Sequence, residues 1–190
     1  LALYIGSSIA LFFVLRPDYP TPTALWQAVF YSVSAFNNAG FSILPHSDNL
    51  TALRDNVHAL TIIALMIMLG GISYTVMVDL FTHGRFNRYT LDTRMVIAAS
   101  VFLWFLGMIV IFLAEYTNSR TLGPMDVQEK AFTAFFHSVS ARTAGFNTID
   151  LGAARQDTTL FITSLMFIGG ASASTAGGIK VNTFAVILAA

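Results

Sequence analysis

The chain contains no cysteine among its 190 residues, so disulfide bonds and thiolate metal sites are excluded. Charged residues are also scarce: they make up 11% of the sequence, against about a quarter in a typical soluble domain. Ten basic residues balance ten acidic ones, which leaves no basic excess for binding a nucleic acid. The four histidines lie far apart, without the spacing of a zinc or iron site. With no nucleophile–base pair in view either, the sequence does not predict an enzyme.

Hydrophobic residues make up 55% of the sequence, and 17 of them are phenylalanine. This composition predicts a membrane protein. A spanning helix needs about 20 apolar residues. The apolar runs at residues 1–15 and 184–190 are shorter than that, so we expect the chain to be part of a longer protein, cut within a spanning helix at each end. The first run lacks the basic start and the cleavage site of a signal peptide.

A small-residue motif centred on glycine occurs twice in the chain. Residues 32–42 read SVSAFNNAGFS, and residues 138–147 read SVSARTAGFN. Each copy follows an aromatic-rich run and precedes a polar segment and then a long apolar segment. Gly-Gly pairs at 70–71 and 169–170 recur at a similar separation of roughly 100 residues, which indicates an internal duplication.

The sequence predicts an all-α membrane protein in which a spanning helix, a short helix, a loop and a second spanning helix occur twice. The two repeats are residues 1–81 and 95–190, joined by a linker at 82–94. The predicted elements are spanning helices at 1–15, 57–81 and 95–113, a long apolar segment at 158–190 interrupted in its middle at 169–178, short helices at 23–35 and 127–141, loops at 37–42 and 142–147, and exposed polar segments at 44–56, 115–129 and 149–157. Thr21 or Thr23 is the expected cap of the first short helix. Both short helices enter and leave on one side, so the arginine-rich linker lies on the other, cytoplasmic side.

The two glycine loops are candidates for an ion selectivity filter. Non-helical backbone at membrane depth is tolerated where it is buried in protein or lines a wet cavity, and its carbonyls can replace the hydration shell of a cation. Neither loop contains an acidic side chain, so a cation would be bound by carbonyl oxygens, with the phenylalanines packed outward. The predicted filter residues are Asn38, Ala39, Gly40, Phe41, Thr143, Ala144, Gly145 and Phe146. The alternative is that both loops are ordinary turns between interfacial helices.

Residues 169–178 form a second unusual segment, built only of glycine, alanine, serine and threonine. One hypothesis is a close helix–helix contact through small residues. The other is an unwound loop beneath the filter that blocks the pore or swings aside. The predicted gating residues are Gly169, Gly170, Ser172, Ser174, Thr175, Gly177, Gly178 and Lys180. Lys180 would face water or a partner, or reach the cytoplasmic interface. Arg142 would brace the second filter loop from behind by donating to carbonyls or to an acidic neighbour.

Three ordered motifs resemble those of the Trk/Ktr/HKT potassium transporter superfamily, and most closely those of the bacterial Trk and Ktr membrane subunits. They are FNNAGFS at 36–42, RTAGFNT at 142–148, and MFIGG through STAGGIK at 166–180. The resemblance implies four membrane–pore–membrane repeats around one pore, of which this chain would be the second and third, with 169–178 as the gating loop. It also implies a homodimer and a cytosolic ring of nucleotide-binding regulatory subunits.

The leading functional hypothesis is therefore gated potassium uptake across the cytoplasmic (inner) membrane by a multi-pass pore subunit, with or without sodium coupling. Potassium would be the transported ion, and no cofactor is expected. Two alternatives stay open: a cation carrier with broken helices that works by alternating access, and a non-conducting membrane scaffold that uses the small-residue runs only for packing. Membrane lipid is an expected partner, and nucleic acid is not.

Overall fold

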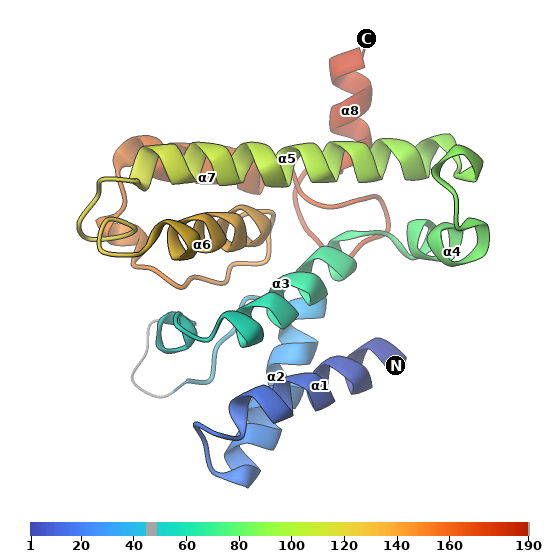
Figure 1. Cartoon of the computed structure of the whole chain (residues 1–190). Coiled ribbons are helices and arrows are strands. Elements are labelled where there is room, and N and C mark those ends of the chain that lie inside the picture. The colour runs from blue at the N-terminus through green and yellow to red at the C-terminus, as the bar shows by residue number, and fades with distance from the viewer. Residues whose placement is uncertain (45–48, 190) are drawn as a thin grey trace.

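A computed structural model describes residues 1–44 and 49–189, and over these residues the protein is helical and contains no β-strand (Figure 1). The predicted all-α fold is confirmed. The α-helices are α1 (Ala2–Leu15), α2 (Thr21–Phe36), α3 (Val57–Gly71), α4 (Tyr74–His83), α5 (Leu91–Glu115), α6 (Val127–Ser140), α7 (Gln156–Phe167) and α8 (Val181–Ala189). Three short 3₁₀ helices join them: η1 (Thr51–Leu53), η2 (Phe86–Arg88) and η3 (Leu151–Ala153).

In the first repeat, α1, α2 and α3 pack on one another around buried leucine, isoleucine and tyrosine side chains. Helix α2 starts at Thr21, two residues before the predicted start, with Pro20 at its N-cap and no side-chain cap bond. The expected threonine cap is therefore wrong. Pro22 sits in the first turn, where its missing N–H leaves no hydrogen bond unmade, and this lets the helix begin directly after the proline-rich turn.

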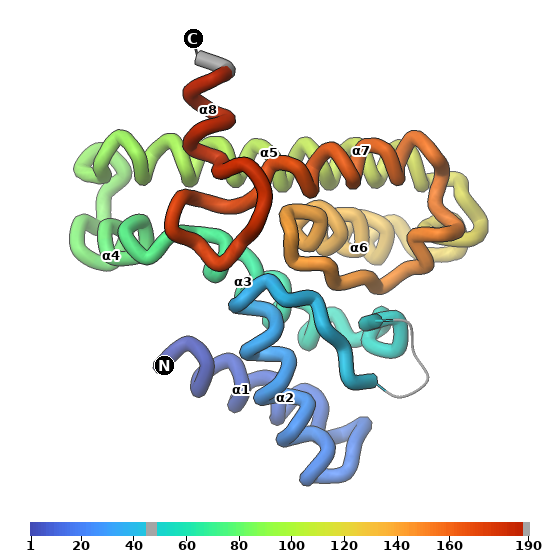
Figure 2. The backbone as a smooth tube through the Cα atoms, turned by 180° about the vertical axis from the view of Figure 1, so that it is seen from behind, coloured from blue at the N-terminus to red at the C-terminus, as the bar shows by residue number. Residues whose placement is uncertain are grey.

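In the second repeat, α6 packs against α5, and α7 runs alongside α5, while α8 points away from this layer (Figures 1 and 2). Helix α6 begins with a capping box: the Asp126 side chain accepts a hydrogen bond from the backbone N–H of Glu129, and the Glu129 side chain accepts one from the backbone N–H of Asp126. Its bounds lie within one residue of the predicted short helix. Helices α7 and α8 flank the small-residue segment, which is not helical.

The predicted continuous helix at 57–81 is wrong. It is two helices, α3 and α4, bent by 101° relative to each other. The chain leaves the helical conformation at Ile72, which is extended, and Ser73 then caps α4 by accepting a hydrogen bond from the backbone N–H of Val76. The bend follows Gly70 and Gly71, the glycine pair that the repeat pattern singles out.

The predicted polar segments also need correction. Positions 45–48 lie outside the described residues, but Leu44, Leu50 and Leu53 are buried, because η1 folds back onto the core of the first repeat. The linker predicted at 82–94 is shorter than expected, since α4 extends to His83 and α5 begins at Leu91. Between them lies η2.

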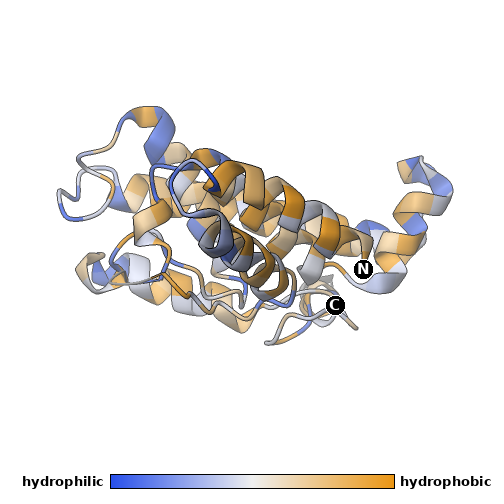
Figure 3. Ribbon diagram, turned by 90° about the horizontal axis from the view of Figure 1, so that it is seen from below, coloured by the Kyte–Doolittle hydropathy of each residue, from blue (hydrophilic) through white to orange (hydrophobic). Residues whose placement is uncertain are grey.

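Among the described residues, one helix is long and apolar enough to cross a membrane, and the bent α3–α4 pair makes a second if it counts as one span. That helix, α5, has 25 residues and is about 38 Å long, against a bilayer core of about 30 Å. Helix α1 exposes an apolar residue at every fourth position, Ile5, Ile9 and Phe13, and continues the row begun by Leu1 at its N-cap. Figure 3 shows apolar residues concentrated in the helices and hydrophilic residues in the connecting loops. Such continuous apolar faces suit lipid or a protein partner.

Glu115, the last residue of α5, is fully buried. Its carboxylate accepts hydrogen bonds from the side chains of Asn118, Thr121 and Thr158 and from the backbone N–H of Arg155. Four donors satisfy the buried charge. They also tie the α5–α6 connection to the first turn of α7, and thus fix where α6 enters the structure.

Replacing Glu115 by glutamine is expected to destabilise the protein by about 2–4 kcal/mol, because the new NH₂ group would face donors that need an acceptor. The measurement is the thermal unfolding midpoint of the full-length protein in detergent. Glu129→Gln is the matched control, since glutamine also serves in a capping box. Equal midpoints for the two variants would contradict the assignment of Glu115 as a buried hub.

Candidate functional site

The two glycine loops have the same backbone form. In the first, Asn38 and Gly40 have positive φ (49° and 69°), and in the second, Thr143 and Gly145 do (71° and 79°). Each loop leaves its short helix by the same bond: the backbone N–H of the alanine before the glycine donates to a serine carbonyl in the last turns of the helix. In both loops, two residues with positive φ flank an alanine with negative φ, so the two loops have the same sequence of backbone conformations.

The loops meet backbone to backbone at their glycines. A methyl group on Gly40 would lie 2.3 Å from the carbonyl oxygen of Ala144 and 3.0 Å from the Cα atom of Gly145. A methyl group on Gly145 would lie 3.7 Å from the Cα atom of Gly40, which is ordinary contact. The two loops of the duplication therefore share one small region of main chain, and Gly40 is the more tightly confined.

The carbonyl oxygens of the eight predicted filter residues fall into two groups. In the first group the oxygens accept a hydrogen bond. The Phe41 and Phe146 carbonyls accept from serine hydroxyls of their own short helices, and the Gly40 and Gly145 carbonyls accept from the side chain of Asn49. The others accept no hydrogen bond within the described part of the chain: they belong to Asn38, Ala39, Thr143 and Ala144. Oxygens without a donor, close to the meeting of two loops, are what a bare cation needs.

The phenylalanines behave differently in the two loops. Phe146 is fully buried, and its ring packs edge-on against Tyr31 of α2, with 6.5 Å between ring centroids. This contact places the second loop against the short helix of the first repeat. Phe41 is 69% exposed over the described residues, so the outward packing predicted for it has no partner there.

An aromatic side chain of each short helix braces the segment that follows each loop. Tyr31 bonds through its hydroxyl to the side chain of Ser42, 2.9 Å away, and accepts from the backbone N–H of Ile43. In the second repeat, His137 Nε2 lies 3.1 Å from the hydroxyl of Thr148 and 3.3 Å from its backbone nitrogen. The same brace is thus built from different residues, which is why sequence comparison of the two copies did not reveal it.

The small-residue segment is an unwound loop that closes on itself at its base. Ile168 and Ile179 form an isolated parallel bridge, in which Gly169 N–H donates to the Ile179 carbonyl at 2.9 Å. A methyl group on Gly169 would collide with the Gly177 carbonyl. Figure 2 shows this red segment between α7 and α8 lying against the α3–α4 junction. Its glycines allow a close packing of main chain on main chain.

The break between α3 and α4 holds this loop in place. The carbonyl of Gly71 accepts from Ala171 N–H at 2.9 Å, and the carbonyl of Gly70 accepts from Thr175 N–H at 3.2 Å. The Thr175 hydroxyl lies 2.9 Å from both the Gly70 and the Phe36 carbonyl oxygens. The two Gly-Gly pairs of the sequence therefore belong to two interruptions that satisfy each other's backbone groups.

The small-residue loop also contacts both glycine loops. Asn38 donates through its side-chain nitrogen to the Thr175 hydroxyl at 2.9 Å. The Thr143 hydroxyl accepts from Gly177 N–H at 3.0 Å. Candidate filter and candidate gate are therefore in direct hydrogen-bond contact in both repeats.

Arg142 is buried, and its guanidinium donates to the Gly169 carbonyl at 2.6 Å while lying over the Trp104 ring. The brace therefore runs to the small-residue loop, and the predicted donation to filter carbonyls is not observed. Lys180 is half-buried and donates to the Ala176 carbonyl at 2.6 Å, within its own loop. Within the described residues, Ser172 and Ser174 make hydrogen bonds through their backbone N–H groups and none through their hydroxyls. Gly170 packs against Gly71, and Gly178 has a positive φ of 71°.

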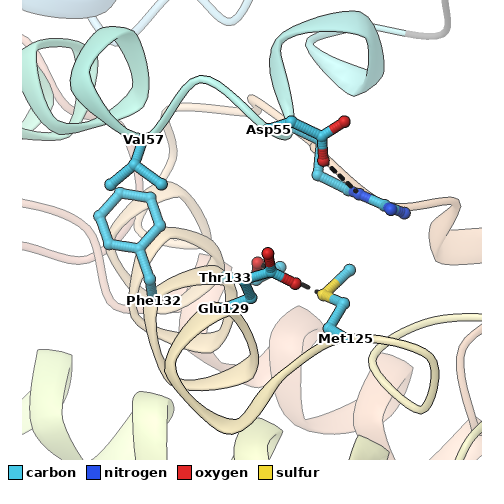
Figure 4. A pocket seen from close by; sticks show the side chains of 7 residues that line it. Asp55, Val57, Met125, Glu129, Phe132 and Thr133 are labelled. Carbon is cyan, nitrogen blue, oxygen red and sulfur yellow. Dashed lines mark hydrogen bonds and ion pairs between the residues drawn. The ribbon is translucent and has the colours of Figure 1, made fainter.

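No three acidic or histidine side chains of residues 1–44 and 49–189 come together as a metal site. A small cavity of about 30 Å³ lies between the start of α3 and the first turns of α6, away from the glycine loops (Figure 4). It has room for about one water molecule. Its lining includes Asp55, Phe132 and Thr133. The glycine loops therefore offer main-chain carbonyl oxygens and the side-chain oxygen of Asn38, which is buried without a hydrogen-bond partner among the described residues.

Short helices that lead into glycine loops, together with an unwound segment bonded to both loops, are typical of membrane proteins in which non-helical backbone is packed inside the protein. The family model described as "TrkH: Cation transport protein" matches residues 3–190. The chain belongs to the TrkH family of cation transport proteins, which are membrane proteins, and the resemblance inferred from the motifs is confirmed.

Relatives and a solved structure agree with this assignment. Ktr system potassium uptake protein B of Bacillus subtilis is 38% identical over 188 residues, covering 99% of this chain and 42% of that protein. The protein of the same name in Vibrio alginolyticus is 39% identical over 172 residues, covering 90% of this chain and 37% of that protein. Potassium/sodium uptake protein NtpJ of Enterococcus hirae is 32% identical over 186 residues, covering 98% of this chain and 41% of that protein.

The crystal structure of the potassium transporter TrkH from Vibrio parahaemolyticus has the same fold, with a TM-score of 0.77 and 22% identity, over 98% of this chain and 37% of that one. The chain spans about two fifths of the length of the relatives it matches.

Replacing Gly70 by alanine is expected to disrupt the α3–α4 junction, because the new methyl group would lie 1.8 Å from the Phe36 carbonyl oxygen. We expect the free energy of unfolding to fall by about 1–3 kcal/mol or more, because the carbonyl carbon and oxygen of Phe36 that the methyl group would meet both belong to the main chain. The measurement is the unfolding midpoint of the full-length protein in detergent.

The neighbouring Gly71→Ala is the matched control, because no atom lies within 4 Å of the added methyl group. A midpoint that falls equally in both variants, or in neither, would contradict the close packing of α3 on the end of α2.

Proposed function

We propose that the full-length protein containing this chain takes up potassium across the cytoplasmic membrane, and that the chain supplies two walls of its selectivity filter. The observation that carries the proposal is the set of carbonyl oxygens without a donor at the point where the two glycine loops meet. Two relatives are named potassium uptake proteins, and a third is named for potassium and sodium, so sodium is the ion against which selectivity is tested.

In this proposal, carbonyls of Asn38, Ala39, Thr143 and Ala144 replace water around the potassium ion. The carbonyls of Gly40 and Gly145 are held by a side chain and set the frame of the site. The C-terminal ends of α2 and α6 point their partial negative charge toward the loops and favour a cation there. No cofactor and no catalytic residue are assigned.

We further propose that the small-residue loop is the gate. It lies below both glycine loops and is bonded to each, so its displacement would free the path beneath them. Its tie to each glycine loop is a single hydrogen bond, worth about 1 kcal/mol, which suits a segment that moves. Arg142 and Lys180 would stabilise its closed form through the carbonyls of Gly169 and Ala176.

The expected assembly follows the family. The protein would be a multi-pass pore subunit, a homodimer, and the membrane partner of a cytosolic nucleotide-binding ring. Relatives named as proteins B and D of a Ktr system support a system of several components. If the protein were a carrier, changes in the small-residue loop would not raise the flux. If it were a scaffold, it would not take up cations.

Gly40→Ser and Gly145→Ser are expected to lower the ratio of potassium to sodium uptake, Gly40→Ser the more strongly because of its 2.3 Å approach to the Ala144 carbonyl. We expect at least about a tenfold loss of the ratio for Gly40→Ser, equivalent to ~1.4 kcal/mol. Uptake is measured with the full-length protein in cells that lack other potassium uptake. Gly6→Ser, with open space around it, is the control. Unchanged ratios in both filter variants would overturn the filter assignment.

Thr175→Val is expected to raise potassium flux about fivefold or more if loop opening limits transport, because the isosteric side chain cannot donate to the Gly70 or Phe36 carbonyl. Deleting residues 171–176 should raise flux further. Ser172→Ala is the control, since the Ser172 hydroxyl makes no hydrogen bond within the described part of the chain. Lower or unaltered flux in well-folded Thr175→Val protein would count against gating by this loop.

A further inference from the structure

Asn49 lies where the two glycine loops meet, although it belongs to neither. Its side-chain oxygen accepts from the backbone N–H of Asn147 at 3.2 Å. A backbone N–H can only donate, so this bond fixes which end of the amide is oxygen and directs the NH₂ group toward the loops. That group donates to the Gly40 carbonyl at 3.3 Å and to the Gly145 carbonyl at 3.1 Å.

The backbone around Asn49 supports this position. Leu50 N–H donates to the Asn147 carbonyl at 2.9 Å, so the bridge between the segments has a main-chain bond as well. Asn49 has a φ of 62°, a left-handed conformation that asparagine, aspartate and glycine adopt more readily than other residues. The site is open to the outside: Asn49, Asn147 and Asp150 line a depression of about 340 Å³.

We propose that Asn49 is a positioning residue for cation selectivity, which sets the spacing of the two filter walls by holding the Gly40 and Gly145 carbonyls with one amide group. The inference rests on the filter function proposed above. It goes beyond that function because Asn49 lies outside both glycine motifs. A single residue of the first repeat would fix the relative position of carbonyl oxygens from both repeats.

The chemistry of the position is specific to an amide. It needs one acceptor for an N–H and one group that donates twice to carbonyl oxygens. Aspartate has nearly the same shape and tolerates the same backbone conformation, but it cannot donate, and it would place negative charge against two carbonyl oxygens. Glycine keeps the backbone conformation and removes the side chain entirely.

The test compares full-length wild-type protein with Asn49→Asp and Asn49→Gly in proteoliposomes, measuring potassium and sodium uptake separately. We expect the potassium-to-sodium ratio to fall at least about tenfold in both variants, the factor expected when two hydrogen bonds to the filter are lost. Unfolding midpoints in detergent report whether each variant is folded. If Asn49→Asp does not fold, Asn49→Gly carries the test, because it introduces neither strain nor charge.

Asn87→Gly is the matched control: it makes the same change at an exposed asparagine of η2, away from both glycine loops, whose side chain makes no hydrogen bond within the described residues. Its ratio should stay that of the wild type. A wild-type ratio in folded Asn49→Gly overturns the role of Asn49 and leaves the filter proposal standing. A wild-type protein without preference for potassium overturns the filter proposal and this inference with it.

Discussion

Backbone groups released at one helix break are satisfied by those released at another, and the rest of the structure depends on this exchange. The carbonyls at the end of α3 accept from the amides of the small-residue loop after α7. Unpaired backbone groups are costly at membrane depth, so this exchange stabilises the arrangement in which the loop lies against the end of α3. Together they form a floor of main chain on which both glycine loops rest, through Asn38 and Thr143.

The features that sequence could predict are those written in local chemistry. Glycines at 40 and 145 were identified because a repeated glycine between small residues calls for a special backbone conformation, and both have positive φ. The bounds of α6 are predicted to within one residue by the aromatic-rich run that precedes the second glycine loop. The break at Ile72 and Ser73 was missed because both neighbouring helices are apolar, and a continuous apolar run looks the same whether it is straight or bent.

Other features depend on contacts between distant parts of the chain, which no local pattern records. Leu50 and Leu53 lie among polar residues, a pattern that predicts exposure, yet the 3₁₀ helix η1 places both side chains in the core. Asn49 looked like one polar residue of a surface segment, and only the approach of residue 147 gives it a role. Asn38 in the first glycine loop corresponds to Thr143 in the second. Both are polar side chains in otherwise small-residue loops, and both bond to the small-residue loop.

The pairing of the two breaks has a consequence for how the protein is made. The amides of Ala171 and Thr175 find their acceptors in residues that leave the ribosome roughly 100 positions earlier, at synthesis rates of about 5–20 residues per second. At this rate the Gly70 and Gly71 carbonyls are made about 5–20 s before the amides that bond to them. Insertion of the second repeat would then be templated by the first, and the order of the repeats along the chain becomes part of the folding instruction.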